Sequence, residues 1–334
     1  MKTPPRSRGA ALLAALLTVA WVATLAAAGL WQQWRAIEVE TAERQRAQSI
    51  WVLLGALDWA RMILREDARA GTTVDHLAEP WALPLQEARL STFLAADRNS
   101  SPGDAAGDNA FLSGDIVDLQ SRLNLQNLLD AGRISPAGLR AFERLFDVLG
   151  LPPSQLDTLV ANLRLASAGG RGAGAYPADL QTDTDTHRIP LMPVRATQLG
   201  WLGLTPATVS ALQPHVTVLP ARTPVNLNTA SAQVIYAAIG GIGLADARRL
   251  VAARAGQALN TPADAARLLG QALPPQALVG VNSRYFEVRG QLRLDQATVQ
   301  VRTLVERDGQ NVKPLQHLRG TTDAIAATDA RAPR

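Results

Sequence analysis

The chain contains no cysteine among its 334 residues. This absence excludes a disulfide framework, a thiol nucleophile and a cysteine-ligated zinc site. Lysine is almost absent as well: Lys2 and Lys313 are the only two, so the formal net charge of +4 comes from arginine and does not indicate a polybasic surface. Hydrophobic residues make up 47% of the chain, which excludes intrinsic disorder and leaves enough material for two or three folded units of roughly 100–200 residues each.

A long apolar run occupies residues 10–31 and contains only two polar side chains, both threonine. Twenty-two helical residues extend about 33 Å, which matches a hydrocarbon core of roughly 30 Å. The basic residues Lys2, Arg6 and Arg8 all precede this run. The positive-inside rule therefore predicts a single membrane pass, with the amino end in the cytoplasm and the rest of the chain exported.

A cleaved secretory signal is the alternative interpretation, with Ala26, Ala27 and Ala28 as a small-residue cleavage site. Against it, no proline or glycine interrupts residues 30–54, and the continuation is amphipathic. Its apolar residues are Trp51, Leu54, Ala56, Trp59 and Ile63, interleaved with Glu43, Arg44, Asp58 and Arg61. We expect one helix from residue 10 to about residue 69, half in a membrane and half packed on a globular head.

The residues around the start of the apolar run, Arg8-Gly9-Ala10, resemble the processing site of type IV pilins. The resemblance implies that prepilin peptidase cuts after Gly9 and that Ala10 becomes the N-methylated first residue. The fifth mature position is Ala14, where most pilins carry a glutamate that is thought to neutralise the amine of a neighbouring subunit. An unpaired charge in apolar surroundings is costly, so the missing glutamate is informative. The subunit type that usually lacks it is minor pseudopilin K of the type II secretion system.

Two further segments closely resemble type II secretion system protein K: DHLAEPWA at residues 75–82 and LSGDIVDLQSRLNLQNL at residues 112–128. The chain is thus identified as a member of that family, with a resemblance that covers about residues 8–318. The fold expected is α+β. A pilin-like long N-terminal helix carries a small antiparallel β-sheet, which is interrupted by a large all-α insertion containing a SAM-like or helix–hairpin–helix lobe.

Local patterns agree with this fold. Alternating apolar residues predict strands at residues 286–294 and 299–305, and Asp308-Gly309 predicts a hairpin turn. Helices are expected after Ser135-Pro136 and after Pro152-Pro153. The predicted parts are a leader at 1–9, a transmembrane segment at 10–34, a first core part at 35–125, an inserted helical domain at 126–281 with its lobe at about 224–270, C-terminal core strands at 282–318 and a disordered tail at 319–334.

The helix–hairpin–helix pattern follows residues 224–230, with Asn228 or Thr229 as the expected helix cap. Gly241 and Gly243 permit a tight hairpin before the second helix, whose exposed amides could hold a phosphate. A membrane-anchored DNA-binding competence protein is therefore the main alternative function. Four arginines against two aspartates over residues 224–270 give a net charge of only +2, so no nucleic-acid partner is expected.

Catalytic patterns are missing from the sequence. The four histidines, His76, His187, His215 and His317, are scattered, and no H-E-x-x-H, G-x-S-x-G or Walker motif occurs. An enzyme is not expected, and a secreted enzyme with an uncleaved anchor is kept as a third hypothesis. No cofactor is required. Calcium is the candidate structural ion, with Asp183 and Asp185 as hard oxygen ligands, because calcium binding is known among related pseudopilins.

The resemblance to protein K implies a mechanical function. Such a subunit forms the pseudopilus tip with minor pseudopilins I and J and initiates pseudopilus assembly for export of folded proteins from the periplasm across the outer membrane. Further implied partners are other pseudopilins, prepilin peptidase, the inner-membrane platform and the secretin. The implied location is the bacterial inner membrane, with the main body in the periplasm.

Overall fold

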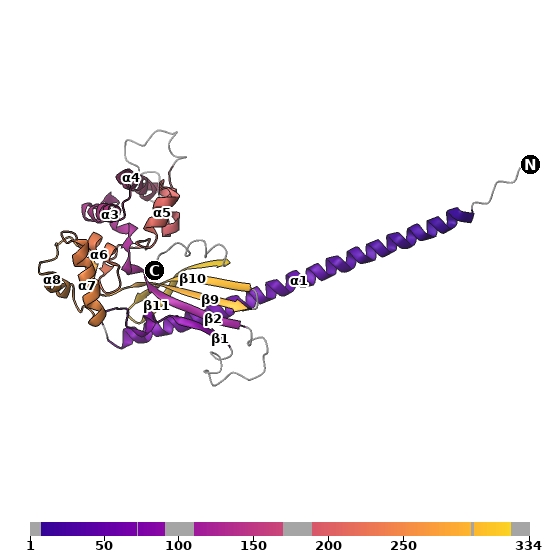
Figure 1. The fold of residues 1–334 in the computed structure, drawn as a ribbon, viewed down its shortest axis with the longest axis horizontal. Helices are drawn as coiled ribbons and strands as arrows, with labels where there is room; N and C mark the ends of the chain where they lie inside the picture. The colour runs from indigo at the N-terminus through magenta and orange to yellow at the C-terminus, as the bar shows by residue number, and fades with distance from the viewer. Residues whose placement is uncertain (1–7, 72, 91–109, 170–188, 295–296, 322–334) are drawn as a thin grey trace, which may run out of the picture. The chain divides into compact units, whose positions relative to one another are not determined.

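The structure of the protein is a computed structural model that describes residues 8–71, 73–90, 110–169, 189–294 and 297–321. Internal contacts divide the chain into two compact units, Met1–Leu54 and Gly55–Arg334. The predicted α+β class is confirmed, since one long helix, several shorter helices and an antiparallel sheet make up the chain (Figure 1). The predicted domain boundaries within the second unit stay predictions.

The long helix α1 spans Arg8–Arg69, and its residues up to Leu54 make up the described part of the first unit. Alanine and leucine dominate its early turns, and both residues have high helix propensity. The two threonines in this stretch satisfy their own hydroxyls, because Thr18 Oγ1 donates to the carbonyl of Ala15 at 2.9 Å and Thr24 Oγ1 donates to that of Trp21 at 2.9 Å. The apolar run therefore leaves no side-chain hydroxyl without a partner.

In the second unit, a five-stranded antiparallel sheet has the order β1-β2-β9-β10-β11 (Figure 1). The strands are β1 Leu85–Arg89, β2 Ala110–Asp118, β9 Tyr285–Leu294, β10 Ala297–Asp308 and β11 Asn311–Thr321. The alternation that predicted β9 and β10 and the turn at Asp308-Gly309 are confirmed. The edge strand β1 was not predicted, because its sequence LQEAR is short and polar. The tail prediction is wrong at residues 319–321, which belong to β11.

The last turns of α1 pack on this sheet. Leu57, Ala60 and Leu64 are buried there against side chains of β9, β10 and β11, among them Phe286 and Val305. This corrects the predicted buried face of the helix: Trp51 is 73% exposed and Trp59 39% exposed. Aromatic residues were given too much weight in that prediction, whereas the smaller aliphatic side chains fit against the sheet.

The remaining helices belong to the insertion between β2 and β9. They are α3 Pro136–Val148, α4 Pro153–Gly169, η7 Ala196–Leu202, α5 Pro206–Leu212, α6 Ala232–Ile239, α7 Leu244–Gly256 and α8 Pro262–Leu269. Both predicted helix starts are confirmed. Ser135 accepts a hydrogen bond from Gly138 N, and proline occupies the first position of both α3 and α4, where a backbone donor is not needed.

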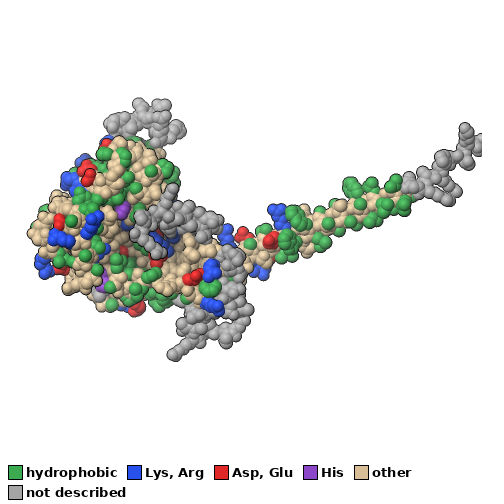
Figure 2. All heavy atoms as spheres, viewed as in Figure 1, with side chains coloured by type: hydrophobic (Ala, Val, Ile, Leu, Met, Phe, Trp, Pro, Cys, Tyr) green, Lys and Arg blue, Asp and Glu red, His purple; other side chains and the backbone are tan. Residues whose placement is uncertain are grey.

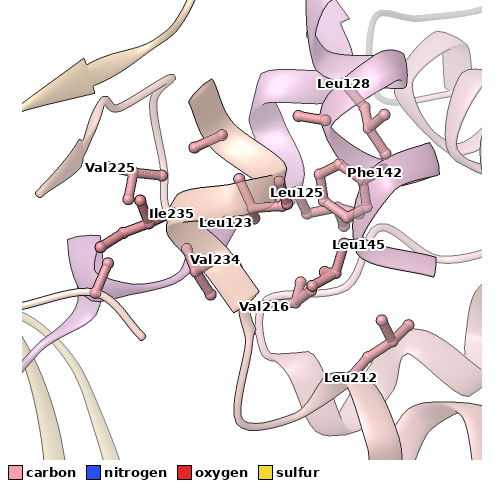
Figure 3. Packing of buried hydrophobic residues seen from close by; sticks show 14 of the residues in the cluster. Leu123, Leu125, Leu128, Phe142, Leu145, Leu212, Val216, Val225, Val234 and Ile235 are labelled. Atoms are coloured by element: carbon pink, nitrogen blue, oxygen red, sulfur yellow. The ribbon is translucent and has the colours of Figure 1, made fainter. Parts of the chain in front are cut away.

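Short elements connect these parts. They are η1 Pro80–Ala82, η3 Leu119–Ser121, β3 Leu123–Asn124, η4 Leu125–Leu128, β4 Leu129–Asp130, β5 Arg133–Ile134, β6 Val216–Thr217, β7 Val225–Asn226 and β8 Val279–Gly280. Figure 3 shows how these elements share one apolar core with the helices: Leu123, Leu125 and Leu128 meet Phe142 and Leu145 of α3. Val234 and Ile235 of α6 complete the same core, so the insertion folds around a single cluster.

The first turn of α3 comes very close to η4. A Cβ added at Gly138 would lie 2.0 Å from the carbonyl oxygen of Asn127. No side chain fits at that distance, and the neighbour is backbone that cannot rotate away. Gly138 therefore fixes how α3 sits against the segment that follows β2.

We predict that Gly138→Ala lowers the free energy of unfolding by about 1–3 kcal/mol or more, because the new methyl forces two backbones apart. Gly256→Ala at the end of α7 is the matched control, since its added Cβ meets no atom within 4 Å. It should leave stability unchanged or raise it by up to about 1 kcal/mol. Thermal unfolding of the full chain in detergent measures both variants, and equal midpoints would contradict this packing.

Candidate functional site

The amino-terminal helix is the first candidate functional element. Within the described residues, one helix is long and apolar enough to cross a membrane, Ala11–Arg69, with a best 18-residue window of mean hydropathy 2.2. Over residues 11–31 of this helix the hydrophobic side chains are exposed, and Figure 2 shows them along this part of α1, with charged side chains further along the helix. Where the apolar run ends, the Arg35 guanidinium lies 5.4 Å from the ring centre of Trp31, an arrangement typical of a membrane interface. This segment therefore has the length and composition of a single-pass membrane anchor.

The predicted processing residues lie at the start of this helix. Gly9 and Ala10 belong to the first turns of α1, and Ala14 follows one turn later with an exposed side chain. An exposed alanine leaves no carboxylate on this face of the helix at the fifth position counted from Ala10. Cleavage after Gly9 and methylation of Ala10 stay predictions.

The segment at residues 112–128 ends in four polar side chains that are all buried: Asp118, Gln120, Asn124 and Asn127. The two asparagines fix the chain before β7. Asn124 Nδ2 donates to the carbonyl of Ala221 at 2.7 Å, and Asn127 exchanges two hydrogen bonds with the backbone of Thr223. Gln120 accepts from Arg284 N at 2.7 Å just before β9. These hydrogen bonds therefore join the segment after β2 to the segment before β7 and to the segment before β9.

Asp118 is the centre of this buried network. Its carboxylate accepts hydrogen bonds from Thr229 Oγ1 at 2.5 Å, Ser283 Oγ at 2.6 Å, Gln120 N at 2.7 Å and Asn226 Nδ2 at 3.0 Å. Burial raises the pKa of Asp118, while these hydrogen bonds act in the opposite direction. The network connects β2, the segment before α6 and the segment before β9.

Arg307 of β10 lies beside this network and closes a second set of contacts. Its guanidinium pairs with Asp67 of α1 at 2.7 Å and with Asp75 at 2.5 Å, and it donates to the carbonyl of Ser283 at 2.9 Å. The side chains of Arg307, Asp67 and Asp75 are only 10%, 9% and 3% exposed. The same guanidinium lies 4.8 Å from the ring centre of Phe286. Its positive charge is therefore compensated by two carboxylates and by the face of an aromatic ring.

Asp67, Asp75 and Glu79 form the one group of carboxylates that could hold a metal ion among the described residues. Arg307 already supplies positive charge to the first two. Glu79 Oε2 accepts from Trp81 Nε1 at 2.7 Å and from His76 N at 2.9 Å. Both donors are within three residues of Glu79 in the chain, so these hydrogen bonds fix the local turn. The predicted calcium ligands, Asp183 and Asp185, lie outside the described residues.

In the described ranges, no histidine ring makes a hydrogen bond to a carboxylate, although His76 lies beside Asp67, Asp75 and Glu79. His76 Nδ1 accepts from Ala78 N at 3.3 Å, as expected of a local hydrogen-bond network. His317 Nδ1 lies 3.0 Å from Thr303 Oγ1 in the sheet. Burial lowers the pKa of His215, whose Nδ1 has no partner among the described residues. His187 lies outside the described ranges.

The helix–hairpin–helix lobe forms as predicted, with α6 and α7 joined by a tight turn. The left-handed conformations fall on Gly240 and Gly241, with φ values of 70° and 73°. Gly243 has extended backbone and serves as the N-cap of α7. The expected cap of α6 is wrong: Ser231 caps α6, whereas Asn228 exchanges hydrogen bonds with the backbone of Leu259.

One of the amides that would hold a phosphate at the start of α7, Gly243 N, is engaged by the chain itself. Asp246 Oδ2 accepts from Gly243 N at 2.9 Å and Asp246 Oδ1 pairs with Arg249 at 2.5 Å. Asp264 caps α8 in the same way by accepting from Thr261 N at 2.8 Å. A carboxylate in the position of the phosphate disfavours DNA binding, because two anions would compete for the same donors.

The arginines of the lobe are also largely engaged. Arg254 donates to the carbonyl of Leu227, and burial lowers its pKa to about 10. Arg267 pairs with Asp264. Among the four arginines of the lobe, Arg248 alone has neither an ion pair nor a hydrogen bond with a described residue, which is too little positive charge for a nucleic-acid face.

Comparison with known protein families gives matches to two neighbouring segments of the chain. Two family models match, both described as type II secretion system (T2SS), protein K: one over residues 121–221 and the other over residues 225–288. The first covers the segment of buried asparagines and the helices after it. The second begins at β7 and ends in β9, so together they span the helical insertion.

Relatives with the name type II secretion system protein K match over nearly the whole chain. The protein of Pseudomonas aeruginosa is 29% identical over 320 residues, which cover 90% of each chain. The protein of Klebsiella pneumoniae is 27% identical over 337 residues, which cover 94% of this chain and 97% of that one.

A solved structure shares the fold. It is a chain in the crystal structure of the GspK-GspI-GspJ complex from the type 2 secretion system of enterotoxigenic Escherichia coli. The TM-score is 0.58 at 17% identity, with 84% of this chain and 98% of that chain covered. This likeness supports the pilin-like α+β architecture.

A membrane-type helix, a small antiparallel sheet and an inserted helical domain together define a pilin-like membrane-anchored protein. Within that class, the chain belongs to the family of type II secretion system protein K. Its role is that of a minor pseudopilin, a structural subunit of the secretion system.

We predict that Arg307→Met lowers the free energy of unfolding by about 3–5 kcal/mol at pH 7, because it leaves Asp67 and Asp75 buried without their cation. Part of this loss should be recovered at about pH 5. Burial raises the pKa of Asp67 above its ordinary 3.8, and the variant removes the charge that opposes this shift. The folded variant then binds more protons than the unfolded chain, so stability rises as pH falls through that pKa.

Arg69→Met is the control for this prediction, since its ion pair with Glu66 is about half exposed on both sides. We expect Arg69→Met to lower the free energy of unfolding by no more than about 1 kcal/mol. Chemical unfolding of the full chain in detergent at the two pH values measures both variants. Equal losses in the two variants, or a further loss of Arg307→Met on acidification, would contradict the role assigned to Arg307.

Proposed function

We propose that this chain is the tip subunit of the pseudopilus, which it forms with minor pseudopilins I and J. In this position it initiates pseudopilus assembly for the export of folded proteins from the periplasm across the outer membrane. Membership of the protein K family supports this proposal. The likeness to a chain of the GspK-GspI-GspJ complex supports the choice of partners.

The observation that carries the proposal is Ala14 on the exposed surface of α1. In a filament whose subunits neutralise a neighbour's amine with a carboxylate at this position, a subunit without the carboxylate lacks the contact to a preceding subunit. An unpaired charge within the apolar filament is very costly. A subunit with alanine at this position therefore suits the first, topmost place and no other.

The proposed location is the inner membrane, with one pass, a cytoplasmic amino end and a periplasmic body. The basic residues before the apolar run support this orientation. The proposed further partners are other pseudopilins, prepilin peptidase, the inner-membrane platform and the secretin. Calcium bound by Asp183 and Asp185 is proposed as a structural ion only.

The processing step is tested by the intact mass and amino-terminal sequence of the membrane-extracted protein, produced with and without prepilin peptidase. We expect a methylated Ala10 only when the peptidase is present. Gly9→Leu should block cleavage, because the residue before the cut loses its small size. Gly29→Leu, in the same helix but away from the cut, should be processed normally. A retained Met1, or a chain that starts after Ala28, would contradict the proposal.

A further inference from the structure

A pocket of about 240 Å³ lies in the helical insertion, between α3, α6 and residues 274–278. Three arginines line it: Arg140 and Arg144 of α3 and Arg222 from the segment before β7. No aspartate or glutamate occurs among its described lining residues. The pocket therefore concentrates positive charge in a concave site, in a chain whose charge is otherwise nearly balanced.

The guanidinium of Arg144 is fixed by hydrogen bonds to the last turn of α6. Its Nε and Nη2 both donate to the carbonyl of Ala237 in the last turn of α6, at 2.9 Å and 2.6 Å. Gly240 makes room for the guanidinium, since a Cβ there would lie 2.8 Å from Arg144 Cζ. Burial lowers the pKa of Arg144 and the nearby charge of Arg140 lowers it further, while Tyr236 and Glu143 act in the opposite direction. Two cations thus lie close enough to repel each other.

The other two arginines are exposed and largely available. Arg140 makes no ion pair with any described residue. Arg222 pairs with Asp130 at 3.0 Å, but both side chains are exposed, at 39% and 65%, so this pair is weak. Two exposed carboxylates, those of Asp130 and Glu143, lie near these three guanidinium groups, so an excess of positive charge is left for an incoming anion.

The backbone around the pocket adds to this preference for an anion. Ala137 and Gly138 in the first turn of α3 line it, and the positive end of the helix dipole lies there. The negative end of α6 is compensated, because Arg144 already binds its Ala237 carbonyl. The N-terminal end of α3 thus favours negative charge in the pocket, and Arg144 offsets the negative end of α6.

Apolar side chains also line the pocket, beside the polar Asn127 and Gln276. Pro274, Ala277 and Leu278 are exposed or partly exposed there, whereas Leu123 and Phe142 belong to the buried core drawn in Figure 3. A free phosphate or a nucleic-acid backbone has no apolar part to place against these side chains. A carboxylate attached to an apolar peptide does, and a pocket of this size accepts one or two side chains.

We propose that this pocket binds the carboxylate of an acidic residue on an otherwise apolar peptide segment of another protein. Guanidinium groups recognise carboxylates by short, charge-assisted hydrogen bonds, while the apolar walls cover the neighbouring side chains. Such binding gives the helical insertion a recognition role that does not depend on where the subunit sits in a filament.

Isothermal titration of the full chain in detergent tests this proposal with an acetylated, amidated octapeptide that carries one central glutamate among alanine and leucine. The matched peptide carries glutamine in place of glutamate. We expect saturable binding of the acidic peptide only, weakened about tenfold by Arg140→Gln and about tenfold by Arg222→Gln. Both arginines are exposed, so these variants should fold normally. Arg248→Gln removes an exposed arginine outside the pocket and should leave binding unchanged.

Three outcomes would overturn the proposal. The first is that the acidic peptide does not saturate, and the second is that the glutamine peptide binds equally well. The third is that binding is unaffected by both pocket variants. A parallel titration with inorganic phosphate decides the ligand class: phosphate binding that Arg140→Gln weakens, without peptide binding, would contradict the assignment to a peptide carboxylate.

Discussion

The ion pairs of Arg307 with Asp67 and Asp75 are the contact on which the arrangement of the second unit depends. They tie the end of α1 and the segment after it to a central strand of the sheet. Asp118 lies next to them, and Ser283 contacts both groups through its carbonyl and its hydroxyl. Because these charges and polar groups are buried, each depends on the others remaining in place.

The same network gives the helical insertion its attachment to the sheet. Asn226 and Thr229, in the segment before α6, reach Asp118 at the end of β2. The lead-in that resembles a DNA-binding lobe is therefore used for packing inside this protein. Asp246 and Asp264 cap the starts of α7 and α8, and the arginine-lined pocket beside α3 is a basic feature of the insertion.

Local patterns in the sequence predicted much of this fold. The apolar run predicted α1, Ser135-Pro136 predicted the start of α3, and strict alternation predicted β9 and β10. Long-range polar contacts could not be predicted, because Arg307 lies 240 residues from Asp67 in the chain. Burial of Asp118 was missed for the same reason: three of its four donors come from two distant segments. The buried asparagines entered the analysis only through family resemblance, since a single sequence gives no local signal for such partners.

The central claim is that a pilin-like subunit with Ala14 occupies one end of a filament. The most direct measurement is the number of copies of this chain per purified pseudopilus, counted by single-molecule fluorescence on filaments of known length. The account predicts one copy at one end, whatever the length, and additional copies along the filament for Ala14→Glu but not for the neighbouring Ala15→Glu. A copy number of the unaltered chain that rises with filament length would contradict it.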